Sequence, residues 1–90
     1  MKDEREERTL DLYGPGDTIT ITAYHEERAR RAHDVRVRLE ALGFVEGTRV
    51  EILRRAPLGD PTEYALRGTR ISLRRTEAAL IHATPTEPRR

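Results

Sequence analysis

The chain has 90 residues, of which 36% are hydrophobic and 37% charged, with a formal net charge of +1 and no cysteine. This length fits one small domain, and the lack of cysteine excludes disulfides, thiolate metal sites and thiol catalysis. A net charge so close to zero gives no overall field that would attract nucleic acid or an anionic membrane.

Both ends of the chain are expected to be charged, disordered tails. Residues 1–8 (MKDEREER) and 85–90 (PTEPRR) contain few apolar side chains, so we expect a folded domain of residues 9–84 between them. The first tail lacks the apolar run of a secretory signal. No apolar run in the chain approaches the ~20 residues that span a bilayer. The sequence therefore predicts a cytoplasmic protein.

The first expected strand follows a turn. Leu10 and Leu12 are spaced to point the same way if residues 9–13 are extended. Residues 14–17 (GPGD) predict a turn, with Gly16 free to take positive φ. Residues 18–24 (TITITAY) alternate β-branched apolar and polar side chains, which predicts a strand. Its core-facing residues would be Ile19, Ile21 and Ala23.

Residues 25–42 change to a helical period. Apolar residues recur there at spacings of three and four, which predicts a helix with one narrow apolar stripe: Ala29, Ala32, Val35, Leu39 and Leu42. Three acid-to-base pairs four residues apart would support it: Glu26–Arg30, Glu27–Arg31 and Asp34–Arg38. Asp34 is also a candidate N-cap for a shorter helix, and this alternative stays open.

The end of this helix is marked by Gly43. This glycine stands where a left-handed residue ends many helices, and Phe44 follows it. In a Schellman ending, Phe44 would pack back on Leu39.

The second half of the chain predicts short strands joined by tight turns. Gly47 and Gly68 mark turns, and the loop 56–61 (APLGDP) contains two prolines and Gly59. Strands are expected at residues 49–55, 62–66, 69–73 and 80–84, with a helical turn at 74–79. Such strands bury their apolar faces by closing or stacking, so the prediction is a small mainly β, five-stranded barrel with one helix and a short helical turn.

These motifs resemble those of the FeoA family, small accessory proteins of bacterial ferrous iron transport. The chain carries L-G-F-x-x-G at residues 42–47, APLGDP at 56–61, R-G at 67–68 and I-S-L-R-x-x-E-A at 71–78, with a closing Ile81. Leu12 and Gly16 are similar to the family's opening L-x-x-G element. The resemblance covers residues 9–83. The charged segment from His25 to Val37 is longer than the usual connection in the family.

The resemblance implies a fold, a role and a partner. It implies an SH3-like barrel without enzymatic activity. The partner would be the cytosolic part of FeoB, the ferrous iron permease, so the chain would meet a membrane only through that partner. The same type of domain occurs at the carboxyl end of iron-dependent repressors. The alternative is therefore a sensory or oligomerisation domain with transition metal binding.

No local pattern indicates a metal site, a cofactor site or a catalytic centre. The helical neighbours of His33 are not ligands, and Glu26, on the same helix face, lies seven residues away, about 10 Å along the axis. The other histidines are His25 and His82. Ser72 is the only serine and has no histidine beside it, and the chain has no P-loop motif. Two alternatives stay open. One is a metal site that uses Asp60 or His82 together with residues distant in sequence, and the other is an arginine finger donated to a partner GTPase.

The loop 56–61 is the candidate partner-binding site. Leu58 would stand at its tip as an apolar anchor, with Arg54, Arg55 and Asp60 beside it. The alternative is that the loop is only a rigid connector. Arginines cluster further along the chain, at Arg67, Arg70, Arg74 and Arg75. The chain has few aromatic side chains for stacking on bases, so we expect no nucleic-acid binding.

Overall fold

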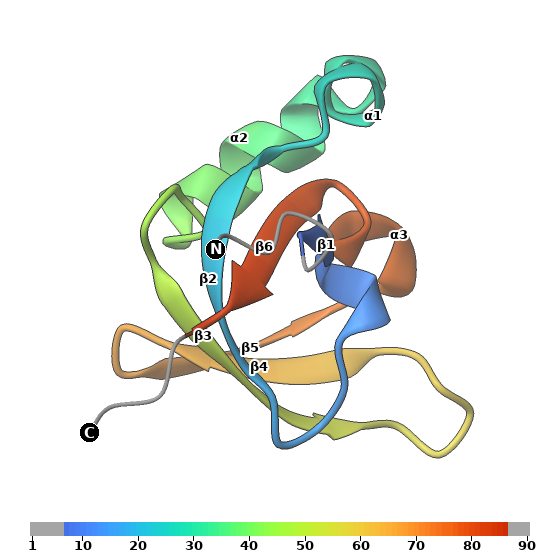
Figure 1. Cartoon of the computed structure of the whole chain (residues 1–90). Coiled ribbons are helices and arrows are strands. Elements are labelled where there is room, and N and C mark those ends of the chain that lie inside the picture. The colour runs from blue at the N-terminus through green and yellow to red at the C-terminus, as the bar shows by residue number, and fades with distance from the viewer. Residues whose placement is uncertain (1–6, 87–90) are drawn as a thin grey trace.

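One antiparallel sheet forms the body of the molecule (Figure 1). The computed structural model describes residues 7–86. Within them the sheet has six strands in the order β1-β6-β2-β3-β4-β5. The strands are β1 (Arg8–Thr9), β2 (Thr18–Tyr24), β3 (Arg49–Arg55), β4 (Thr62–Leu66), β5 (Thr69–Leu73) and β6 (Ile81–Pro85). The helices are the 3-10 helix η2 (Leu10–Leu12) and the α-helices α1 (Glu26–Arg31), α2 (His33–Ala41) and α3 (Arg75–Ala78).

The mainly β prediction is confirmed, with two differences in detail. The described strands number six because a two-residue strand, β1, adds to one edge of β6. The sheet curls around its core (Figure 1), yet its order ends at β1 and β5, and no ladder between these two is found within residues 7–86. The barrel is therefore open along that side.

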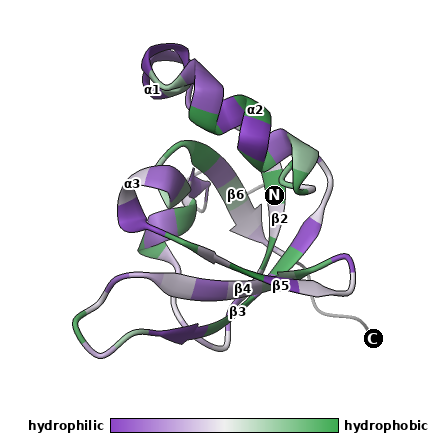
Figure 2. Cartoon of the chain, turned by 180° about the vertical axis from the view of Figure 1, so that it is seen from behind, coloured by the Kyte–Doolittle hydropathy of each residue, from purple (hydrophilic) through white to green (hydrophobic). Residues whose placement is uncertain are grey.

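The core fills the concave side of the sheet. Alternate residues of each strand point inward, as the period-2 pattern predicts. Figure 2 shows apolar and polar segments alternating along the chain. The largest fully buried side chains are Tyr64, Phe44, Leu10, Ile19, Ile21, Leu39, Ile52, Ile81 and Val50.

Leu12 does not point the same way as Leu10, and Ala23 does not face the core. Leu12 is 62% exposed, because residues 10–12 form a 3-10 helix and not an extended strand. Its three-residue turn buries Leu10 and leaves Leu12 on another face. Ala23 is exposed as well. The register between β2 and β6 shifts between Ile21 and Ala23, and such a bulge interrupts the alternation of faces.

The predicted long helix is broken in two. Ala32 takes φ −125° and ψ 50°, ends α1 and begins α2. The single helix over residues 25–42 is therefore wrong. The shorter helix capped by Asp34 is wrong as well, because Asp34 lies inside the first turn of α2 and does not cap it. Leu42, expected on the apolar stripe, is 40% exposed. Of the three predicted ion pairs only Glu27–Arg31 forms among the described residues.

The end of α2 is the predicted Schellman motif. Gly43 has φ 111°. The N–H of Phe44 donates to the carbonyl of Leu39 at 3.0 Å, and the N–H of Gly43 donates to that of Glu40 at 3.0 Å. Leu39 and Phe44 are both fully buried. This ending directs the chain from the helix into the core.

The hairpin between β4 and β5 turns at Arg67 and Gly68. Their φ angles are 51° and 77°. Two successive positive φ values define the type I′ turn that suits the twist of a hairpin.

The expected tails lie mostly outside the described residues, which leave out residues 1–6 and 87–90. Arg8 and Pro85, placed in the tails by the sequence, pair in strands with Ala83 and Ile19. The folded unit thus extends beyond residues 9–84 at both ends. Across residues 7–86, each helix is too short or too polar to cross a bilayer.

Candidate functional site

The loop 56–61 joins β3 to β4 and has its own hydrogen bonds. The N–H of Ala56 donates to the carbonyl of Pro61 at 2.9 Å, and the N–H of Gly59 donates to that of Ala56 at 2.7 Å. Gly59 has φ 92°, a conformation that a side chain would strain. The backbone of this loop is thus held in one shape.

Two side chains fasten the base of the loop to the rest of the molecule. Asp60 Oδ1 accepts a hydrogen bond of 2.9 Å from the backbone N–H of Arg75, at the start of α3. Arg55 Nη2 donates to the carbonyl of Tyr13 at 2.6 Å, and its Nε donates to Thr62 Oγ1 at 2.9 Å. Arg55 and Asp60 therefore position the loop.

The other two predicted residues face solvent. Leu58 is 94% exposed at the tip of the loop. Arg54 is exposed and its Nε lies 3.4 Å from Glu63 Oε1 on β4. A groove of about 530 Å³ runs beside the loop, with Pro57 and Pro61 in its lining. All four predicted residues are exposed, and two of them, Arg55 and Asp60, also hold the loop through hydrogen bonds.

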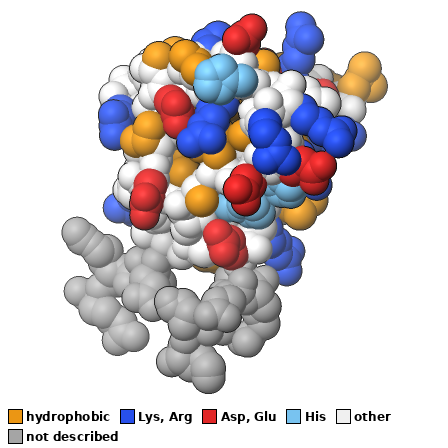
Figure 3. Space-filling view, turned by 90° about the horizontal axis from the view of Figure 1, so that it is seen from above, with side chains coloured by type: hydrophobic (Ala, Val, Ile, Leu, Met, Phe, Trp, Pro, Cys, Tyr) orange, Lys and Arg blue, Asp and Glu red, His pale blue; other side chains and the backbone are white. Residues whose placement is uncertain are grey.

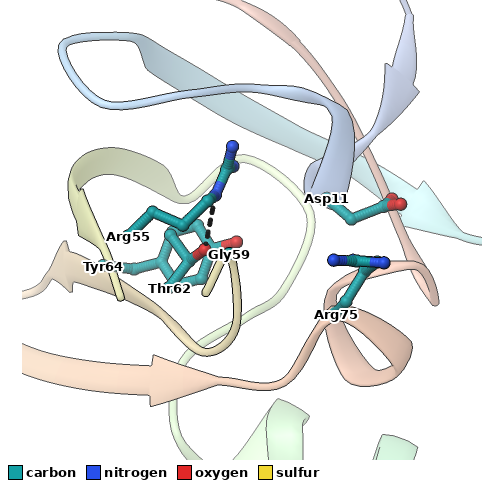
Figure 4. A pocket seen from close by; sticks show the side chains of 6 residues that line it. All are labelled: Asp11, Arg55, Gly59, Thr62, Tyr64 and Arg75. Carbon is teal, nitrogen blue, oxygen red and sulfur yellow. Dashed lines mark hydrogen bonds between the residues drawn. The ribbon is translucent and has the colours of Figure 1, made fainter. Parts of the chain in front are cut away.

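A charged pocket lies under the same loop (Figure 4). Its volume is about 180 Å³, and its lining is Asp11, Arg55, Gly59, Thr62, Tyr64 and Arg75. In this view Asp11 and Arg75 lie on one side of the pocket, and Arg55, Gly59, Thr62 and Tyr64 lie on the other. Of these residues, Arg55 and Gly59 stand in the segment that the sequence marked as a site.

Not every polar group of this pocket has a hydrogen-bond partner. Asp11 Oδ1 is buried and has no hydrogen-bond partner within residues 7–86. Burial raises the pKa of Tyr64 to about 12, against the opposing effect of the Arg55 charge. Tyr64 is therefore a neutral hydroxyl at physiological pH.

Sequence reasoning missed four pocket residues: Asp11, Thr62, Tyr64 and Arg75. Asp11 comes from η2, Tyr64 from β4 and Arg75 from α3. No spacing in the sequence links them, because the fold alone brings these three elements together. The one local signal was the run of alternating Tyr64 and Leu66, which predicts inward side chains but not a pocket.

The histidines lie on the side of the molecule that carries α1. The rings of His25 and His82 stack with centroids 5.4 Å apart and an interplanar angle of 17°. His25 Nδ1 caps α1 by accepting the N–H of Arg28 at 3.2 Å. Within the described part of the chain no three His, Cys, Asp or Glu side chains are grouped to hold a metal ion. Figure 3 shows basic and acidic side chains interspersed over this face.

The predicted arginine cluster is dispersed over the structure. Arg67 Nη2 donates to Thr48 Oγ1 at 3.2 Å and borders a shallow groove with Arg49. Arg70 is exposed on β5, whereas Arg75 belongs to the pocket. These side chains do not form one continuous site.

The family model of the FeoA domain matches residues 8–85. No curated protein matches the sequence. A FeoA-like protein from Clostridium acetobutylicum is 27% identical in a superposition with TM-score 0.74, covering 94% of this chain and 93% of that one.

Two further solved structures relate the fold to known proteins. The FeoA of Stenotrophomonas maltophilia, complexed with zinc, is 28% identical with TM-score 0.70, over 83% of this chain and 87% of that one. That protein is described as a prokaryotic SH3 domain protein, which supports the predicted SH3-like class. A manganese-dependent transcriptional repressor in complex with manganese shares the fold at 18% identity and TM-score 0.77, over 89% of this chain and 37% of the repressor.

Proposed function

Because the chain belongs to the FeoA domain family, we propose that this accessory protein of ferrous iron transport binds the cytosolic part of a FeoB-type permease. It acts in the cytoplasm by association and without catalysis. The relative from Stenotrophomonas maltophilia is described as a candidate activating factor for bacterial ferrous iron transport. That description supports a role in which docking on the transporter changes its activity.

The observation that carries this proposal is the display of Leu58. Its side chain is 94% exposed, so it adds almost nothing to the stability of the free protein. The loop beneath it is held by its own hydrogen bonds and by Asp60 and Arg55. An apolar side chain on a rigid support loses little conformational entropy when a partner covers it. Arg54 lies two residues before the loop and adds a charged side chain at the rim of the proposed docking site.

We expect Leu58→Ala to weaken binding to the permease's cytosolic part about tenfold or more, as for a buried interface anchor. The melting temperature should stay nearly unchanged, because Leu58 is not packed in the free protein. Isothermal titration calorimetry with the purified cytosolic part of the permease measures the first effect, and a thermal melt measures the second.

Leu12→Ala is the matched control, since Leu12 is also an exposed leucine but lies in η2. It should leave the affinity unchanged. Equal affinities for Leu58→Ala and the unmodified protein would refute the loop as the docking site. Arg54→Ala should have a smaller effect than Leu58→Ala, because Arg54 is paired with Glu63 and exposed ion pairs contribute little.

The alternative function is a sensory or oligomerisation domain that binds transition metals. Its support is the fold shared with the manganese-dependent repressor. Titration of the protein with Mn²⁺, followed by light scattering for its mass, separates the two functions. Metal-dependent assembly without affinity for the permease would favour this alternative.

A further inference from the structure

The sheet ends at β5, whose outer edge has no strand beside it. Among residues 7–86, β5 pairs with β4 alone, and the turn end of this hairpin projects from the body of the molecule (Figure 1). Its five residues pair without a register shift, whereas the ladders of β2 with β6 and β3 with β4 contain one each. Prolines, bulges or very short strands usually keep an edge from pairing. Since β5 (TRISL) has none of these features, a further strand can pair with it.

The outward backbone groups of β5 belong to Arg70 and Ser72. The two-residue turn makes Leu66 and Thr69 a pair that exchanges hydrogen bonds. Hydrogen-bonded and non-hydrogen-bonded pairs alternate along an antiparallel ladder, so Ile71 also directs its N–H and C=O groups toward β4. Those of Arg70 and Ser72 therefore point away from the sheet, and an added strand would bind there.

A second copy of the chain fits this edge in one register. Outward groups meet only when the two-fold axis between the antiparallel strands passes through Arg70, Ile71 or Ser72. An axis at Arg70 sets this arginine against its own copy, and an axis at Ser72 sets Arg70 against Arg74, whose backbone is still extended. Like charges directly opposite are unfavourable. An axis at Ile71 sets Arg70 opposite Ser72 of the second copy, and no arginines then face each other.

The same register brings opposite charges together on the outer face of the sheet. Glu63 lies beside Ser72 in the β4–β5 ladder, and both line the groove of about 530 Å³. The second copy's Arg70 would be next in this row, about 10 Å from Glu63 at two strand spacings. Ser72 is small, so the arginine can extend across it. Among the described residues the Glu63 carboxylate pairs with Arg54 only, through Oε1, which leaves Oε2 for a second guanidinium.

Ile71 adds an apolar contact on the inner side of the edge. Its side chain is partly buried against the core, and the axis sets it opposite its own copy in a non-hydrogen-bonded pair, where side chains lie closest. We propose that β5 is the contact surface for a second copy of this chain, which pairs with it antiparallel about Ile71. The contact is short, so the dimer is weak, with a Kd of roughly 100 µM.

Sedimentation of the whole chain at rising concentration tests the proposal. A dimer should form between about 10 µM and about 1 mM. Over the same range the amide NMR signals of Arg70 and Ser72 should shift, because these groups enter new hydrogen bonds. The amide of Thr69, which is bound to β4, should shift less. A chain that stays monomeric throughout this range overturns the proposal.

Ser72→Pro and Ser72→Ala form a matched pair of variants. Proline removes the outward N–H but no hydrogen bond to β4, so the fold should persist while the dimer is lost. Alanine keeps that N–H and should keep the dimer. Circular dichroism and thermal melts verify that both variants fold. A folded Ser72→Pro protein that still dimerises overturns pairing through this edge.

Charge exchange tests the register without a proline. Arg70→Glu and Glu63→Arg each set like charges against one another across the axis, so each variant alone should dimerise several-fold more weakly than the unmodified chain. An equal mixture of the two variants restores both contacts between opposite charges and should dimerise as the unmodified chain does. A mixture that dimerises no better than either variant alone overturns the register about Ile71.

An extended segment of the permease is the other occupant that such an edge could take. In that case the chain alone would stay monomeric and Ser72→Pro would weaken binding to the permease, a result that overturns pairing between copies. Leu58 lies outside β5, so Leu58→Ala should leave the dimer unchanged. The dimer therefore does not depend on whether the loop 56–61 binds the permease.

Discussion

Gly43 is restricted both by its backbone and by its neighbours. Its φ of 111° is unfavourable for any side chain, and a Cβ there would lie 3.2 Å from Arg67 Cδ. We expect Gly43→Ala to lower the free energy of unfolding by about 1–2 kcal/mol. Urea denaturation of both proteins measures this difference.

Gly14→Ala is the control for that experiment. Gly14 has no positive φ, and a Cβ there would meet nothing within 4 Å. Its replacement should be close to neutral. A Gly43→Ala protein as stable as the control would show that the Schellman ending contributes little.

Tyr24 gives the protein a predictable response to alkaline pH. Its hydroxyl donates to the carbonyl of Phe44 at 2.7 Å, and burial, followed by the charge of Glu40, raises its pKa well above the usual value. Tyr64 is affected in the same direction by its burial. The folded protein therefore holds protons that the unfolded chain releases above pH 10, so the contribution of these two tyrosines to stability is fully present below pH 10 and is lost as pH rises beyond it.

Tyr24→Phe tests this expectation. At pH 7 it should cost about 1 kcal/mol through the lost hydrogen bond to Phe44. Between pH 10 and pH 12 its stability should fall less steeply than that of the unmodified protein. Melting temperatures measured over this range would contradict the argument if the two slopes were equal.

At the scale of elements, the loop 56–61 depends on its tie to α3. Among the described residues, Asp60 is the only side chain of that loop that forms a hydrogen bond to α3. We expect Asp60→Ala to speed hydrogen exchange of loop amides several-fold, at a cost of about 1 kcal/mol or less in global stability. Exchange of the β2–β3 ladder amides serves as the internal reference, and unchanged loop exchange would show that other contacts hold it.

The elements differ in how far the sequence could predict them. The strands β3, β4 and β5 agree with their predicted bounds, because alternation and glycine turns are local signals. The break at Ala32 was not predicted, since alanine favours helix. Tertiary contacts hold each half instead: Ala29 of α1 and Leu39 of α2 are fully buried, and the N–H of His25 donates to the carbonyl of Leu80 at 2.7 Å.

At the scale of the whole molecule, the fold was more predictable than the site. Family motifs and strand patterns indicated the mainly β, SH3-like class, and the family model confirms the resemblance. The exposure of Leu58 was also expected from its place in the loop. The pocket was not expected from the sequence, because only the packing of α3 against η2 brings Asp11 and Arg75 to the same place. Contacts of that kind leave no periodic trace in a sequence.

The strand order has a consequence for how the protein is made. β6 is the last strand in the chain, yet it lies between β1 and β2, and the Tyr13 hydroxyl donates to Ala83 on it at 2.9 Å. A ribosome must therefore synthesise residues 81–85 before β1 can join the sheet, whereas β2 to β5 are neighbours that pair without β6. A nascent polypeptide that stops short of Ile81 would lack the strand that joins β1 to the other four strands, and quality-control proteases would meet it as an incompletely folded chain.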